Sequence, residues 1–133
     1  MIMLDTHIWV RWQNAPDALP QNVLNWIENS NNLVVSAISC WEVAMLVRKQ
    51  LIKLAMPIAE WIDEALASMN SCLSVDRNIM LLAAQLPDHH RDPADRMIIA
   101  TAIHYQTRLI SFDEMFSAYT ELDGLLLPSK TRP

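Results

Sequence analysis

Residues 92–113, DPADRMIIATAIHYQTRLISFD, join a helix signal directly to a strand signal. Asp92 and Pro93 are typical of a helix start, because aspartate caps the first turn and proline fits the first helical position. We therefore predict a helix over 92–105 and, after a short connection, an apolar strand over 109–111. A helix that leads straight into an apolar strand is the repeating unit of an α/β fold.

The same alternation of short apolar runs and longer helical patterns covers the rest of the chain. Its clearest helical stripe follows Pro57, where apolar residues recur at intervals of three and four. The other predicted strands cover residues 1–4, 33–35, 72–74 and 125–127, and the other predicted helices cover 6–13, a segment after Pro20, 39–50, the segment after Pro57 and 76–86. The strands are continuous apolar runs, which is typical of a parallel sheet with helices on both faces.

Length and composition favour one compact domain. The chain has 133 residues, of which 52% are hydrophobic, and we predict a single domain over 1–128 with a polar tail at 129–133. The two cysteines, Cys40 and Cys72, lie in apolar runs without a CxxC pattern and are interpreted as buried thiols. Neither a signal peptide nor an apolar stretch long enough to cross a membrane is recognisable, so we expect a cytoplasmic protein.

Glycine content and charge exclude several modes of nucleotide binding. Gly124 is the one glycine in the sequence, which excludes Gly-rich phosphate loops and dinucleotide fingerprints. The net charge is −5, so the chain is a poor candidate for holding nucleic acid by bulk electrostatics. Phosphate chemistry on this protein would therefore need bound cations.

Four acidic residues lie where their carboxylates could meet at the ends of the predicted strands. Asp5 comes directly after the first strand, and Asp113 comes shortly after the fourth. Glu42 lies early in the helix after the second strand, and Asp95 lies in the first turn of the helix before the fourth. Ligands bind at the carboxyl ends of strands in such sheets, so these carboxylates can converge. Repulsion between them would make the cluster costly without a cation such as Mg²⁺.

Each of these acids also has a structural interpretation. Ser39 and Glu42 match the S-x-x-E capping box, and Asp92 and Asp95 suit the cap and first turn of a helix. Asp113 can start a turn, and Asp5 can cap the helix that follows it. The residues alone leave a metal site and structural roles both open. For Asp76, which also follows a strand, we favour the helix cap.

Four motifs in order resemble those of PIN-domain ribonucleases, above all the VapC-type toxins of bacterial toxin–antitoxin pairs. The motifs are LDTH at 4–7, SAIS at 36–39 leading to Glu42, DPADR at 92–96 running into IIATA at 98–102, and LISFD at 109–113. The resemblance covers residues 2–128. It implies a three-layer α/β/α sandwich with a central parallel sheet of four to five strands, and a Mg²⁺- or Mn²⁺-dependent site that cleaves RNA.

The resemblance also implies roles for individual residues. The metal-binding and catalytic acids would be Asp5, Glu42, Asp95 and Asp113. Asp95 is preferred to Asp92 as the third acid because it stands immediately before the apolar helix pattern. Asp92 would then cap the helix, or contact one of the ligand residues without binding the metal itself. Thr6 and Ser111 match positions where the family often has hydroxyls that bind an acid or a metal-bound water.

The basic residues, histidines and tryptophans each allow a structural role and a binding role. His90, Arg91 and Arg96 would flank the cleft and could meet phosphate, although His89 and His90 are favoured as loop residues rather than metal ligands. For Arg48, Lys49 and Lys53, interaction with a helix C-terminus is favoured over contact with an RNA backbone. The tryptophans are expected mostly in the core, with some available for an interface: Trp9, Trp12, Trp26, Trp41 and Trp61.

The expected reaction is metal-assisted hydrolysis of an RNA phosphodiester, with water as the nucleophile. The family likeness further implies a homodimer and a cognate antitoxin protein as partner. The sequence leaves three alternatives open. They are a receiver-like phospho-switch module, a non-catalytic PIN-like scaffold that binds RNA or protein, and a nuclease that acts on DNA.

Overall fold

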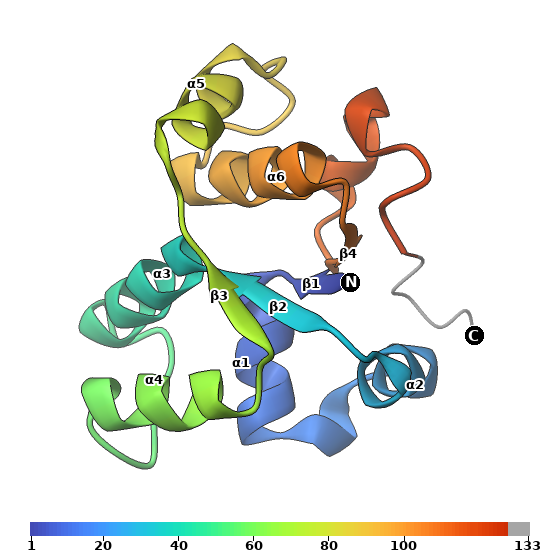
Figure 1. Cartoon of the computed structure of the whole chain (residues 1–133). Coiled ribbons are helices and arrows are strands. Elements are labelled where there is room, and N and C mark those ends of the chain that lie inside the picture. Colours follow the sequence, from blue (N-terminus) through green and yellow to red (C-terminus); the bar gives the residue numbers. More distant parts are fainter. Residues whose placement is uncertain (128–133) are drawn as a thin grey trace.

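A four-stranded parallel sheet forms the centre of the protein in a computed structural model that describes residues 1–127 (Figure 1). The strands are β1 (Ile2–Leu4), β2 (Leu33–Ser36), β3 (Ser71–Leu73) and β4 (Arg108–Ile110), and their order across the sheet is β3-β2-β1-β4. The pairs β1–β2, β1–β4 and β2–β3 are all parallel. The first strand therefore occupies an interior position with a partner on each side.

Helices fill the connections between these strands. The six α-helices within residues 1–127 are α1 (Thr6–Asn14), α2 (Gln21–Asn29), α3 (Ala37–Arg48), α4 (Ile58–Ala67), α5 (Arg77–Gln85) and α6 (Pro93–Tyr105). Three short 3-10 helices are η1 (Pro16–Ala18), η2 (Glu114–Ala118) and η3 (Thr120–Leu122). Helices α5 and α6 lie on one side of the sheet, and α1, α2 and α4 lie on the other (Figure 1).

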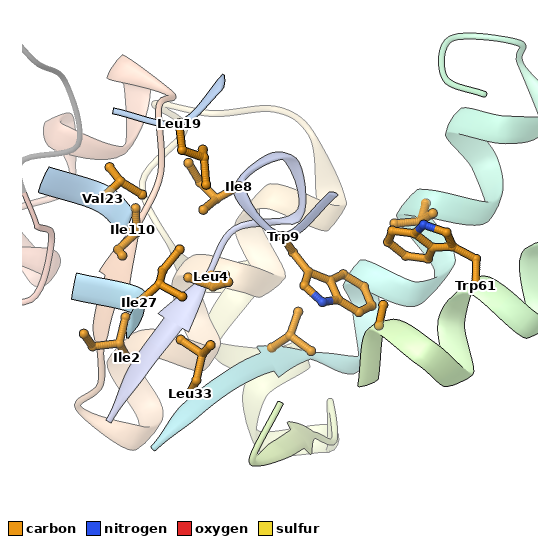
Figure 2. Close-up of a cluster of buried hydrophobic side chains, with 13 residues drawn as sticks. Ile2, Leu4, Ile8, Trp9, Leu19, Val23, Ile27, Leu33, Trp61 and Ile110 are labelled. Atoms are coloured by element: carbon orange, nitrogen blue, oxygen red, sulfur yellow. The ribbon is translucent and has the colours of Figure 1, made fainter. Parts of the chain in front are cut away.

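Alternate residues of the strands divide the core into two layers. On β1, Ile2 and Leu4 pack with residues of α1, α2 and α4, whereas Met3 packs with residues of α5 and α6. In the first layer the rings of Trp9 and Trp61 meet edge to face, with centroids 5.2 Å apart (Figure 2). Burial on both faces explains the uninterrupted apolar runs, and the predicted three-layer α/β/α class is confirmed.

Three local predictions differ from the structure. Residues 125–127 do not form a regular fifth strand, because only the isolated parallel bridge from Leu126 to Leu109 is made. Helix α3 begins at Ala37, two residues earlier than predicted, with Ser36 as its cap. Cys72 is exposed rather than buried, because it lies on the edge strand β3.

Two predicted helix caps are confirmed. The Asp76 carboxylate accepts a hydrogen bond of 3.0 Å from the Ile79 amide at the start of α5. Asp92 Oδ1 accepts from the amides of Ala94 and Asp95 at the start of α6. The predicted tail, 129–133, lies outside the described residues. Among residues 1–127, the helices are too short or too polar to cross a membrane.

Candidate functional site

The carboxyl ends of the central strands place four acids at one edge of the sheet. Asp5 directly follows β1, and Asp113 follows the neighbouring strand β4. Glu42 lies in the second turn of α3, and Asp95 lies in the first turn of α6. Because parallel strands end at the same edge, residues far apart in sequence meet there.

Three of these acids form one group, which we call the central acids: Asp5, Glu42 and Asp95. Each offers a carboxylate oxygen, and these three oxygens lie within 4.8 Å of one another. Asp5 is 3% exposed, and the side chain of Asp95 is 14% exposed. Three carboxylates this close and this shielded from water repel one another strongly if all are ionised.

Both oxygens of Asp5 are held by hydrogen bonds. Ser111 Oγ donates to Oδ2 at 2.7 Å, and the Thr6 amide donates to Oδ1 at 2.7 Å. Burial nevertheless raises the pKa of Asp5, and the hydrogen bond from Ser111 partly offsets that effect. Asp5 is thus a fixed acid whose ionised form needs further stabilisation.

The Glu42 carboxyl is less well satisfied. Its Oε1 is buried and has no hydrogen-bond partner within residues 1–127. Burial raises the pKa of Glu42, and the neighbouring Thr6 hydroxyl offsets part of the rise. The capping-box interpretation of Glu42 is wrong, because Ser39 lies inside α3 and its hydroxyl accepts a hydrogen bond of 2.8 Å from Thr6 Oγ1.

The pKa of the Asp95 carboxyl is strongly raised. Burial, followed by the charges of Asp5 and Glu42, raises its pKa to about 8. Asp92, the alternative third acid, serves as the cap of α6 and belongs to neither group of potential ligands among the described residues. The geometry therefore favours Asp95 over Asp92 as the third member.

A histidine joins the site from the loop before α6. His90 Nε2 lies 2.7 Å from Asp113 Oδ2 and 3.0 Å from Asp95 Oδ2. His90 Nδ1 accepts a hydrogen bond from the Asp92 amide, so the proton of a neutral ring sits on Nε2 and is donated to the acids. From the sequence, His90 is expected to be a loop residue rather than a metal ligand, and the family resemblance places it beside the cleft. No local pattern around residue 90 indicates where its ring points.

The loop carrying His90 is fixed by a guanidinium group. Arg96 donates to the carbonyl oxygens of Ala83, Leu86, Pro87 and His90 at 2.7–3.1 Å. The Arg96 nitrogens bind backbone oxygens and one lies 3.5 Å from an Asp88 carboxylate oxygen, and the side chain is 12% exposed, so contact with phosphate stays an untested prediction. Arg96 acts as a structural anchor for the loop.

These residues suit a hard divalent cation. The central acids supply closely spaced oxygen ligands, and the buried Glu42 Oε1 lacks the partner that a buried polar atom normally has. A cation would also offset the burial and the neighbouring negative charges that together raise the pKa of Asp95. His90, Asp95 and Asp113 form a second group whose ligand atoms lie within 4.8 Å of one another.

Comparison with known proteins places this arrangement in a family. The PIN-domain model matches residues 2–122. Ribonuclease VapC22 of Mycobacterium tuberculosis (strain ATCC 25618 / H37Rv) is 33% identical over 119 residues, covering 89% of this chain and 91% of that protein.

Two solved structures show the same fold. The chain resembles one in the structure of VapBC2 from Rickettsia felis bound to a DNA fragment from their promoter, with a TM-score of 0.70, 21% identity and coverage of 96% and 98% of the two chains. It also resembles one in a toxin-antitoxin complex from Klebsiella pneumoniae, with a TM-score of 0.67, 16% identity and coverage of 98% of both chains. The family match and the VapC relative together show that this chain belongs to the PIN-domain family.

Proposed function

We propose that this protein is a divalent-metal-dependent endoribonuclease that hydrolyses RNA phosphodiester bonds. The observation that carries the proposal is the meeting of Asp5, Glu42 and Asp95 within 4.8 Å, together with the unpartnered Glu42 Oε1. RNA as the substrate is supported by the name of the relative, Ribonuclease VapC22. Membership of the PIN-domain family removes the receiver-like alternative.

The central acids would hold Mg²⁺ or Mn²⁺, with Asp113 assisting from the adjacent group. A divalent cation supplies a lowered pKa for water and neutralises charge on phosphoryl oxygens. Ser111 and the Thr6 amide keep the Asp5 carboxylate in one orientation through their hydrogen bonds. The Thr6 hydroxyl, hydrogen-bonded to Ser39, ties α1 to α3 and so places Glu42 opposite Asp5. Water as the nucleophile predicts products with 5′-phosphate and 3′-hydroxyl ends.

In the cell, we propose that the protein acts as the toxin of a toxin–antitoxin pair. Support comes from the likeness to a chain in a toxin-antitoxin complex and to a chain of VapBC2. The expected partners are RNA and a cognate antitoxin protein, and a homodimer remains a prediction. A cytoplasmic location is part of the same proposal, because cellular RNA is found there.

The test is cleavage of single-stranded RNA in Mg²⁺ or Mn²⁺, compared with the same reaction in chelator and with DNA of the same sequence. Asp5→Asn, Glu42→Gln and Asp95→Asn should each lose nearly all activity while remaining folded. Asp76→Asn is the matched control, because this acid caps α5 away from the site. Full activity of the Asp5 and Asp95 variants would remove the metal-site proposal, and absence of cleavage by the wild type in either metal would favour the non-catalytic scaffold.

A further inference from the structure

Two hollows adjoin the central acids. One has a volume of about 320 Å³ and is lined by Asp5, Arg11 and Phe112 among others. The second has a volume of about 400 Å³ and is lined by Glu42 together with Trp41 and Lys49. Asp95 and His7 line both, so the two hollows meet at the acids. We call the combined depression the trough.

Each half of the trough pairs a cationic side chain with an aromatic ring. In the first half, the Arg11 guanidinium lies 5.6 Å from the centre of the Phe112 ring and covers that ring. In the second half, Trp41 is 55% exposed and lines the hollow beside Lys49. A tryptophan this exposed, directly before a central acid on α3, is not explained by packing of the core.

The trough carries charges of both signs. Arg11 lines the first half with Asp113, Lys49 lines the second half with Asp92, and the central acid Asp95 lines both. Once a cation is bound at the central acids, a chain of phosphates in the trough would meet one positive side chain in each half. Exposed aromatic rings beside such cations are the features with which proteins bind single-stranded nucleic acids.

We propose that the trough holds a single-stranded RNA segment and that the Trp41 indole is the platform on which one of its bases stacks. The occupant follows from the groups that the trough combines: a positive side chain and an aromatic ring in each half, with the central acid Asp95 lining both. This inference rests on the proposed ribonuclease function, because it assigns the reacting phosphate to the central acids. Trp41, unlike Phe112, is not covered by Arg11 and offers its ring to a base.

The decisive experiment combines Trp41 variants with RNA that lacks one base. Short oligoadenylate RNAs, each with one abasic nucleotide at a successive position, are bound to the full chain in Ca²⁺ in place of Mg²⁺, so that the acids carry a cation, and binding is followed by fluorescence anisotropy. For the wild type, one abasic position should weaken binding by about 5- to 150-fold, the range expected for loss of one base stack. Trp41→Ala should weaken binding of intact RNA by a similar factor and abolish the effect of that abasic position.

Two further variants separate stacking from folding. Trp41→Phe keeps a ring and should retain most of the affinity. Met80→Ala is the matched control, because Met80 is an exposed apolar residue (49%) on α5, outside the trough. The concentration of RNA that half-saturates cleavage in Mg²⁺ should rise for Trp41→Ala with little change in the maximal rate.

Several results would overturn the assignment. Equal binding by the wild type and Trp41→Ala, or an abasic effect that persists in the variant, would remove the stacking role. Dissociation of a dimer by Trp41→Ala, seen by sedimentation, would show that a second copy covers this face instead. If the Asp5 variant loses cleavage and Trp41→Ala has no effect, the ribonuclease proposal stands and the stacking role falls. If RNA binding depends on Trp41 but the wild type does not cleave RNA, the stacking role stands and the ribonuclease proposal falls.

Discussion

Ser111 Oγ donates a hydrogen bond of 2.7 Å to Asp5 Oδ2 across 106 positions of sequence. Ser111 Oγ also accepts a hydrogen bond of 3.0 Å from the Asp113 amide. Ser111 thereby joins the acid after β1 to the acid after β4. One buried hydroxyl thus links the two acids that follow these neighbouring strands.

Ser111→Ala should lower the free energy of unfolding by about 1–3 kcal/mol, because it leaves a buried acceptor on Asp5 without its partner. It should also raise the pKa of Asp5, since this hydrogen bond opposes the effect of burial. Urea unfolding measures the first effect, and carboxyl chemical shifts in NMR measure the second. Ser117→Ala, which removes an exposed hydroxyl that donates to the local Glu114 carbonyl, provides the control. Equal stability of the two variants would contradict the prediction.

In chelator, the protein should become less stable as the pH rises from about 4 to about 8. The pKa of Asp95 is about 8 in the folded protein against a reference value of 3.8, so within this window the folded state keeps a proton that the unfolded state has lost. Ionisation then places another charge beside Asp5 and Glu42. The decline should level off above pH 8.

Asp95→Asn tests this directly, because it removes the titrating group while keeping the shape of the side chain. Urea unfolding at a series of pH values should show a shallower decline for Asp95→Asn than for the wild type. The slope for Asp76→Asn should match that of the wild type. If Asp95→Asn had the same slope as the wild type, the raised pKa would be wrong.

Divalent metal should stabilise the folded protein. An ion that binds only the folded state contributes about 2.7 kcal/mol at a concentration one hundred times its Kd. Melting temperature should therefore rise with Mn²⁺ concentration for the wild type and for Asp76→Asn, but not for Glu42→Gln. A rise of equal size in Glu42→Gln would place the bound ion away from the central acids.

Arg96→Lys should cost about 2 kcal/mol or more in the free energy of unfolding. A lysine ammonium cannot reproduce the planar set of donors with which Arg96 reaches four carbonyl oxygens. Urea unfolding provides the measurement. Arg77→Lys, at an exposed arginine of α5, should change stability by less than about 0.5 kcal/mol. Similar values for the two variants would show that the contacts of Arg96 contribute little.

The layers of this fold were predictable from the sequence. Strands buried on both faces appear in it as uninterrupted apolar runs, and these runs indicate a sheet with helices on both sides. The sequence also predicted the caps Asp76 and Asp92, since a capping carboxylate acts within a few residues of itself. The start of α3 was misplaced because Ser36 and Ser39 are both acceptable caps locally. The choice between them depends on Thr6, 33 positions away from Ser39, whose hydroxyl donates to Ser39.

The candidate site was predictable only in part for a similar reason. Asp5 and Asp113 follow strands that pair with each other, so topology places them at one edge of the sheet. The position of the His90 ring depends instead on Asp92, Asp95 and Asp113, and that of its backbone on Arg96 and Tyr119. No local pattern at residues 89–90 encodes such a set of distant contacts.

The order of the strands has a consequence for synthesis of the protein. β1 is made before β4, its neighbour in the sheet, and α6 supplies Asp95 well after Asp5 has been made. A growing polypeptide on the ribosome therefore lacks a complete set of acids until α6 has been translated. For the ribonuclease proposed above, the nascent chain would be unable to cut its own message before that point.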